Sequence, residues 1–352
     1  MDAQRRERYS RQILFAEIGE QGQERLCASS AVVVGCGALG SALANLLVRA
    51  GVGRLRIVDR DFVEPSNLQR QTLFEEADAC EALPKAIAAQ RRLGAINSDV
   101  QVEGVVADLG PANIDELLGG FPLVLDGTDN FETRLLVNDY AVSRSVPWIY
   151  AAVVGSYGLT MAIRPGETAC LACLAESGGA AGDVGVDVAG APGAEATCDT
   201  VGVLGAAAGV IASIEAASAL KLLLGKSCAA DGRLVSYDVW TGRFQAIGTR
   251  RDAGCRACGQ RKFPYLEGQA QAHLTMCGRD SVQIHERRRS LDLAALGQRL
   301  SVAGSEVRHN EFLLRFRVAP YEITVFADGR AIIKGTRDAA MARSLYARYV
   351  GS

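Results

Sequence analysis

Residues 31–40, with the sequence AVVVGCGALG, decide the fold of this protein. The stretch begins as a run of β-branched residues, which is typical of a strand buried on both faces of a sheet. Three glycines follow at the spacing Gly-x-Gly-x-x-Gly, and residues 41–50 after them have helical composition. Gly51 and Gly53 end that helix, and residues 55–59 predict a second strand. The stretch therefore predicts the first strand–helix–strand unit of a parallel sheet.

The same alternation continues to about residue 151. The later segments are expected to form, in order, helix 84–93, strands 100–106 and 123–126, helix 131–143 and strand 148–151. Alternating strands and helices predict an α/β fold, with a Rossmann-like, mostly parallel sheet covered by helices on both faces.

Beyond this point the sequence predicts antiparallel strands, at 157–163, 234–239 and 244–248. The segment 201–224 between them is apolar and long enough to span a bilayer. Glu215 and Lys221 interrupt it, and its Gly and Ala content is typical of a helix packed closely inside a protein core. We therefore expect a core helix here and no membrane partner.

The length of 352 residues predicts two domains. The first is expected to cover residues 1–265, and a small α+β domain of unknown role to cover 276–352. In this tail, Asp328-Gly329 lies between two alternating runs and is a strong hairpin signal.

Composition excludes several classes of partner. The chain has 38 basic and 40 acidic residues, so its formal net charge is only −2 and gives no long-range attraction to nucleic acid or anionic lipid. The first eight residues are charged, and no apolar signal segment follows them. We expect a cytoplasmic protein without a nucleic-acid partner.

The glycine motif is a candidate nucleotide site. Gly35, Gly37 and Gly40 follow a strand and open a helix, and Asp59 follows about 20 residues later, where a carboxylate can bind a ribose hydroxyl. NAD, FAD and ATP all fit this pattern. The alternative is that the glycines only permit a tight strand-to-helix turn.

Charged residues near later strand ends favour a triphosphate. Asn67, Arg70 and Lys85 are candidates for phosphate contacts, and Asp129 is a candidate magnesium ligand. All three histidines lie after residue 270, outside the predicted nucleotide domain. Nucleotidyl transfer needs positive charge more than a histidine base, so this placement favours it over hydride transfer.

Four of the ten cysteines form two CxxC pairs, Cys170/Cys173 and Cys255/Cys258. Two such pairs can present four thiolates to a structural Zn²⁺ ion with no open position. A redox pair and unliganded buried cysteines are the alternatives. The expected ligands are all four of these cysteines.

Cys198 differs from the remaining cysteines, because it follows a Gly- and Ala-rich stretch at 176–197 and precedes the apolar helix. A thiolate near the positive end of a helix is favoured, so Cys198 is a candidate nucleophile. The others are expected to be small hydrophobic fillers: Cys27, Cys36, Cys80, Cys228 and Cys277.

Taken together, these motifs resemble the ThiF/MoeB/HesA family, bacterial relatives of ubiquitin-activating enzymes. The resemblance covers about residues 5–262 and rests on RYSRQI (8–13), GCGALG (35–40), SNLQRQ (66–71), PK (84–85), DGTDN (126–130) and both CxxC pairs. It implies a homodimer that uses Mg²⁺ and ATP to adenylate the C-terminal glycine of a ubiquitin-like sulfur carrier ending in Gly-Gly, with release of pyrophosphate. The sulfur would come from a donor such as a cysteine desulfurase or a rhodanese.

The resemblance also implies residue roles. Asp59 would bind the ribose, while Asn67, Arg70 and Lys85 would bind the phosphates. Asp129 would bind magnesium, and Arg11 would reach the ATP of the partner subunit. Cys198 aligns with a cysteine that becomes linked to the carrier in some members. The tail departs from members with a rhodanese domain, because it is too short and lacks the cysteine loop of that domain.

Three alternative functions remain open at this point. One is a peptide-modifying adenylyltransferase of the same superfamily, and another is an NAD-dependent oxidoreductase. The third is a non-enzymatic scaffold, against which the presence of Arg11, Arg70, Lys85 and Asp129 argues.

Overall fold

The computed structural model describes residues 1–175, 201–226, 232–269, 281–284, 291–302, 307–336 and 338–351. The chain forms two compact units, Met1–Ala270 and Gln271–Ser352. Cys198, Cys228 and Cys277 lie outside the described residues, as do His273 and His285.

Unit 1 is built on an eight-stranded sheet with the order β3-β2-β1-β4-β5-β6-β7-β8. The first five strands in this order are parallel, and β6, β7 and β8 each pair antiparallel with the strand before them. The strands are β1 (Ser30–Val34), β2 (Arg54–Asp59), β3 (Gln101–Val106), β4 (Val124–Asp126), β5 (Trp148–Val154), β6 (Tyr157–Ile163), β7 (Arg233–Asp238) and β8 (Arg243–Gly248). The predicted α/β sheet with an antiparallel extension is confirmed.

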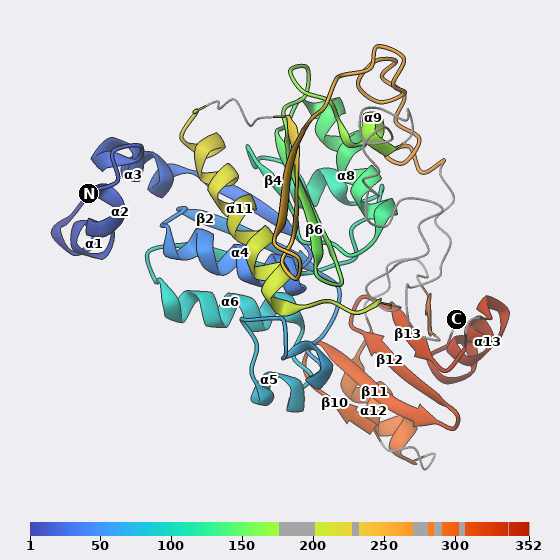
Figure 1. The fold of residues 1–352 in the computed structure, drawn as a ribbon. Coiled ribbons are helices and arrows are strands. Elements are labelled where there is room, and N and C mark those ends of the chain that lie inside the picture. The colour runs from blue at the N-terminus through green and yellow to red at the C-terminus, as the bar shows by residue number, and fades with distance from the viewer. Residues whose placement is uncertain are drawn as a thin grey trace. The chain divides into compact units, whose positions relative to one another are not determined.

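Helices cover both faces of this sheet (Figure 1). One apolar cluster joins alternate strand residues to α4 (Ala38–Arg49), α6 (Lys85–Ile96) and α11 (Gly205–Leu223). The other cluster joins the opposite face to α7 (Ile114–Leu118), α8 (Phe131–Arg144) and α9 (Leu171–Ala175). Val32 and Val34 belong to one cluster and Ala31 and Val33 to the other, as expected of a strand buried on both faces.

Helix α11 is long and apolar enough to cross a membrane by length and composition, a test that the core helices of soluble proteins also pass. It packs against α4, β5 and β6, and its Glu215 is fully buried. These contacts agree with the predicted core helix. The helix begins at Gly205, because Val203 instead forms a bridge to Gly155.

Several short helices of unit 1 were not predicted from the sequence. Helices α1 (Ala3–Arg8), α2 (Ser10–Ile13) and α3 (Gly19–Ala28) precede the sheet. The 3₁₀ helix η1 (Pro65–Asn67) and helix α5 (Glu76–Cys80) lie between β2 and α6. Each is too short, or too polar, to give a clear helical period.

Unit 2 is an α+β module, as the tail predicts. Its antiparallel sheet has the order β10-β11-β12-β13-β9, and α12 (Leu293–Val302) and α13 (Ala339–Tyr349) contribute to its apolar core. The strands are β9 (Ser281–Ile284), β10 (Val307–His309), β11 (Leu313–Val318), β12 (Tyr321–Phe326) and β13 (Ala331–Lys334). The turn at Asp328-Gly329 joins β12 to β13, which confirms the predicted hairpin.

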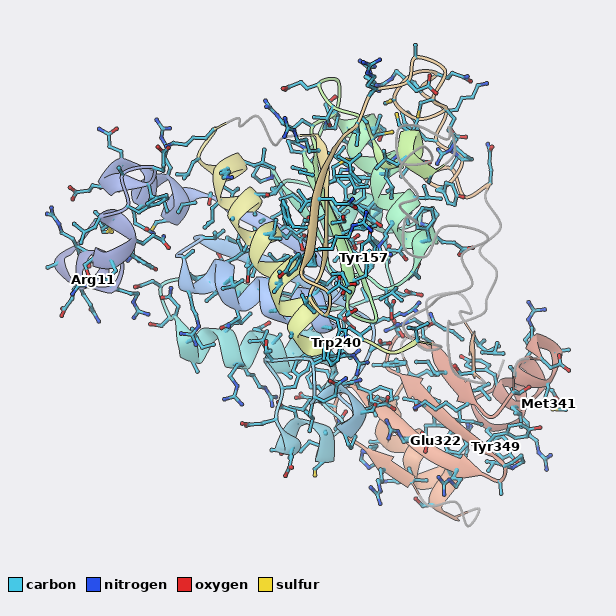
Figure 2. The ribbon with its side chains drawn as sticks, in the orientation of Figure 1. Arg11, Tyr157, Trp240, Glu322, Met341 and Tyr349 are labelled. Atoms are coloured by element: carbon cyan, nitrogen blue, oxygen red, sulfur yellow. The ribbon has the colours of Figure 1, made fainter. Side chains whose placement is uncertain are left out.

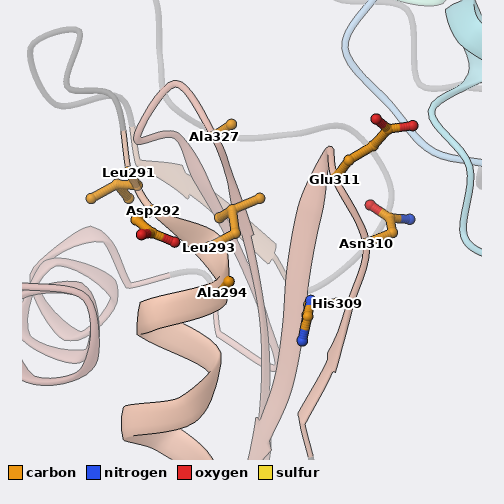
Figure 3. A pocket seen from close by; sticks show the side chains of 8 residues that line it. All are labelled: Leu291, Asp292, Leu293, Ala294, His309, Asn310, Glu311 and Ala327. Atoms are coloured by element: carbon orange, nitrogen blue, oxygen red, sulfur yellow. The ribbon is translucent and has the colours of Figure 1, made fainter.

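A shallow pocket of about 510 Å³ lies in unit 2, at the start of α12 (Figure 3). Asp292 and Glu311 face it, but the Asp292 carboxylate also accepts a hydrogen bond from the Ala295 amide at 3.0 Å.

Candidate active site

The glycine-rich turn between β1 and α4 is shaped by two close backbone approaches. Gly35 has a φ of +86°, which favours glycine, and a Cβ on Gly40 would clash with the Gly35 carbonyl. Gly37 differs, because the nearest atom to a Cβ built there is the Gly127 carbonyl oxygen at 3.8 Å. Packing therefore explains Gly35 and Gly40, whereas Gly37 leaves open space beside the first turn of α4.

No side chain caps the N-terminus of α4, since Gly37 occupies the N-cap position. The backbone amides of a first helical turn favour anions. Space beside Gly37 and uncapped amides together suit a phosphate group. The alternative that all three glycines serve only the turn does not account for Gly37.

Asp59 lies at the carboxyl end of β2, and its side chain forms a hydrogen bond with the backbone of this turn. One carboxylate oxygen accepts a hydrogen bond from the Cys36 amide at 2.5 Å, and the other accepts one from the Asp61 amide at 2.7 Å. Burial raises the pKa of the Asp59 carboxyl. The residue predicted to bind the ribose thus also holds the backbone of the glycine turn.

Lys85 begins α6 and is buried, with an ion pair of 3.1 Å between its Nζ and Oδ2 of Asp61. Burial would lower the pKa of its ammonium group, but the carboxylates of Asp61 and Asp59 outweigh burial and raise that pKa. Lys85 therefore carries a positive charge at the edge where the strands end. The role of Asp61 as the partner of Lys85 was not predicted from the sequence, although Asp61 lies only two residues after the predicted ribose ligand Asp59.

The segment containing Asn67 and Arg70 folds over the same edge. Asn67 is buried, and its Oδ1 accepts a hydrogen bond from the Glu64 amide at 3.0 Å in the cap of η1. Arg70 is half-buried, and its Nη1 donates to the Ser66 carbonyl at 2.8 Å. Gly205, the first residue of α11, lies against Arg70, because a Cβ there would be 3.5 Å from its Cα.

Asp129 follows β4, the strand next to β1, and is exposed. Among the described residues its carboxylate has no hydrogen bond or ion pair. It nevertheless lies near two cations, because its charge adds to the larger effect of Asp61 in raising the pKa of Lys85, and to the larger effects of Asp108 and Asp61 in raising the pKa of Arg60. An exposed, unpaired carboxylate can serve as one ligand of a hydrated divalent cation.

Arg11 is not part of this group. It lies on α2, among the N-terminal helices, and is exposed (Figure 2). Within the described part of the chain it makes no hydrogen bond or ion pair. The structure thus gathers Gly37, Asp59 and Lys85 at one edge, and leaves Arg11 apart from them.

The four cysteines of the CxxC pairs form a separate, buried cluster whose Sγ atoms all lie within 4.8 Å of one another. Individual Sγ–Sγ distances are 3.8 Å for Cys170–Cys173, 3.7 Å for Cys170–Cys255 and 3.3 Å for Cys173–Cys258. Four sulfurs at about 2.3 Å from a tetrahedral zinc ion would lie about 3.8 Å apart. The cluster therefore has the dimensions of a structural zinc site.

Two neighbouring residues of α8 hold both halves of the cluster in place. The Leu171 amide donates to Asn138 Oδ1 at 2.9 Å, and Arg256 Nη1 donates to Asp139 Oδ1 at 2.7 Å. Both α8 residues are fully buried. Neither residue was predicted from the sequence, because neither belongs to a recognisable motif.

Comparisons with known proteins agree with this geometry. The model of the ThiF family matches residues 9–257. The sulfur carrier protein ThiS adenylyltransferase of Bacillus subtilis is 45% identical over 350 residues, which are 98% of this chain and 99% of that protein. The sulfur carrier protein adenylyltransferase of Thermus thermophilus is 40% identical over 258 residues, 72% of this chain and 90% of that one.

The fold also matches solved structures. The crystal structure of Escherichia coli MccB with ATP aligns with a TM-score of 0.59 and 22% identity, over 72% of this chain and 74% of that one. This likeness shows the fold alone. The sequence matches confirm the family resemblance that the motifs predict, and the match to the Bacillus subtilis protein extends through unit 2.

Proposed function

Because this chain belongs to the ThiF family, we propose that it adenylates the C-terminal glycine of a ThiS-like sulfur carrier, using ATP and releasing pyrophosphate. The observation that carries the proposal is the 45% identity to a ThiS adenylyltransferase over nearly the whole of both chains. The acceptor would be a ubiquitin-like protein ending in Gly-Gly, within a pathway such as thiamin or molybdopterin synthesis. We place the enzyme in the cytoplasm, where reducing conditions keep thiolates available for zinc.

The residues at the strand ends fit ATP. The triphosphate would lie at the open turn of Gly37 and the start of α4, within reach of Asn67, Arg70 and Lys85. Asp59 would bind the ribose. Asp129 would hold Mg²⁺, which supplies neutralising charge for the phosphates. Zn²⁺ would occupy the four-cysteine cluster as a structural ion.

The reaction follows from this placement. The carrier carboxylate attacks the α-phosphorus, a P–O bond to it forms, and the bond from the α-phosphorus to pyrophosphate breaks. Lys85 and Arg70 stabilise the negative charge that moves onto the leaving group. No proton has to be transferred, so the absence of a histidine from the described part of the site costs nothing.

Arg11 would complete the site across a homodimer. It is exposed and has no partner within the described residues of its own chain. A guanidinium from the partner subunit would add charge at the triphosphate.

The test is ATP–pyrophosphate exchange with a panel of purified carriers ending in Gly-Gly. We expect one or more carriers to stimulate exchange, and a matched carrier with an amidated C-terminus to fail. Stimulation by free peptides alone would instead indicate a peptide-modifying enzyme. Saturable NAD binding without affinity for ATP would indicate the oxidoreductase.

Cys198 is proposed as the site of a covalent link to the carrier: its thiolate would attack the carbonyl carbon of the carrier acyl-adenylate, forming a thioester and releasing AMP. We expect Cys198→Ala to retain adenylation and to lose any carrier adduct that survives denaturation without reductant. The measurement is the mass of the intact enzyme after turnover. An adduct that persists in the variant would exclude Cys198.

A further inference from the structure

A buried ion pair lies directly beneath the segment that carries Asp129. Arg134, on α8, donates from Nε to Asp126 Oδ2 at 3.0 Å. Arg134 is 4% exposed and Asp126 is 3% exposed. Both are separated from solvent, and the Arg134 guanidinium lies 5.5 Å from the centre of the buried Tyr150 ring.

The hydrogen bonds of this pair act on the backbone of residues 126–130. Arg134 Nη2 donates to the Thr128 carbonyl at 2.7 Å and to the Ala151 carbonyl of β5 at 3.0 Å. Asp126 Oδ1 accepts from the Thr128 amide at 2.9 Å and from its hydroxyl at 2.7 Å. The residue immediately before Asp129 is therefore held at three of its polar groups.

The other side of Asp129 is held as well. Asn130 caps α8, with its Oδ1 accepting from the Thr133 amide at 2.8 Å. Glu215 of α11 also holds this segment, because its Oε1 accepts a hydrogen bond from the Asp126 amide at 3.2 Å. The anchors surround Asp129, while its own carboxylate stays without a partner in the described structure.

A buried ion pair is a poor device for stability alone. Removing two charges from water is so costly that apolar replacements of similar volume are often neutral or stabilising. The geometry here instead fixes one short segment, and misplacement of a reacting group by about 1 Å can cost about 100-fold in rate. The contacts suit a role in placing Asp129.

We propose that Arg134 is a positioning residue, which fixes the backbone immediately before Asp129 so that the carboxylate of Asp129 meets the magnesium ion without reorganisation. The inference rests on the proposed magnesium role of Asp129. It predicts that a substitution of Arg134 raises the magnesium concentration that the reaction requires and also lowers its rate.

The test is the Mg²⁺ dependence of ATP–pyrophosphate exchange in Arg134→Met. We expect the half-saturating Mg²⁺ concentration to rise about tenfold, and Arg134→Lys to restore part of the loss. The control is Arg144→Met, which removes an exposed ion pair with Asp115 from the same helix. It should leave the magnesium requirement unchanged.

A second, milder variant keeps the proposal testable if Arg134→Met does not fold. Thr128→Val removes only the hydroxyl bond to Asp126, and we expect a rise of about threefold in the same half-saturating concentration. An unchanged magnesium requirement in the folded variants, with Asp129→Ala impaired, would overturn the proposal. Wild-type enzyme without exchange would instead refute the proposed function, and a fully active Asp129→Ala would refute the magnesium role.

Discussion

The edge of the parallel sheet and the four-cysteine cluster are both polar centres of unit 1, but they differ in what they leave open. The cluster is closed, since its cysteines are all buried with their sulfurs turned toward one another. At the sheet edge, Lys85 and Asp59 are buried, whereas Asp129 is exposed and unpaired among the described residues. A closed set of ligands suits a structural ion, and an open one suits a substrate.

Because of this difference, we expect substitutions at the two centres to have different effects on stability and on activity. Loss of a ligand from a closed site removes binding energy that is also folding energy. Loss of an open, exposed group removes little folding energy, because it makes few contacts in the folded protein. Two substitutions test whether stability and chemistry separate in this way, and a third tests the buried carboxyl of Glu215 next to the sheet edge.

The largest effect on stability is expected from Cys255→Ser. A serine hydroxyl is a poor zinc ligand, so the variant should lose its zinc and about 3–5 kcal/mol of the free energy of unfolding. Bound metal analysis and thermal unfolding with and without chelator measure this. Cys80 is exposed and is therefore not the buried filler that the sequence predicts, so Cys80→Ser is the control and should behave as wild type. Full stability in a zinc-free Cys255→Ser would contradict a structural role for the cluster.

Asp129→Ala should give the converse result. We expect exchange to fall about 100-fold to 1000-fold, the range for removing one charge-stabilising group from a reaction centre. Its unfolding free energy should stay within about 0.5 kcal/mol of wild type. Glu132→Ala removes another exposed carboxylate nearby and should keep full exchange. Equal losses in both variants would show that the assay reports general surface charge.

The third effect is a change of stability with pH, and it concerns Glu215, whose pKa is raised well above its usual value by burial and then by the charge of Asp126. The folded protein then keeps a proton that the unfolded chain loses above about pH 4.3. Stability relative to Glu215→Gln should therefore fall as pH rises, by about 1.4 kcal/mol per pH unit until the folded-state pKa is reached. Denaturant unfolding of both proteins between pH 4.5 and 8 measures the difference. A constant difference would mean that Glu215 is ionised in the folded state.

Much of the fold follows from local sequence. The β-branched run at 31–34, the glycine turn after it and the repeated alternation of strands and helices identify the sheet, because burial on both faces demands continuous apolar strands. The hairpin at Asp328-Gly329 and the clustering of the two CxxC pairs were also predicted from the sequence, because in both cases the residue types and their spacing indicate the local geometry. The residues 176–200, with Cys198, lie outside the described structure, so the role of Cys198 stays a prediction.

By itself, the sequence determined the order of the main strands and longer helices of the sheet, the four cysteines that cluster and the motifs of the candidate site. Only the tertiary structure decided which polar groups form ion pairs and hydrogen bonds with one another. Asp61 pairs with Lys85 across 24 residues, and Arg256 pairs with Asp139 across 117. Glu215 meets the amide of Asp126 from 89 residues away. The packing of helices against the sheet determines which groups lie next to each other. A buried charge is costly unless it is paired, so it pairs with a group that this packing brings close, however far away in the sequence.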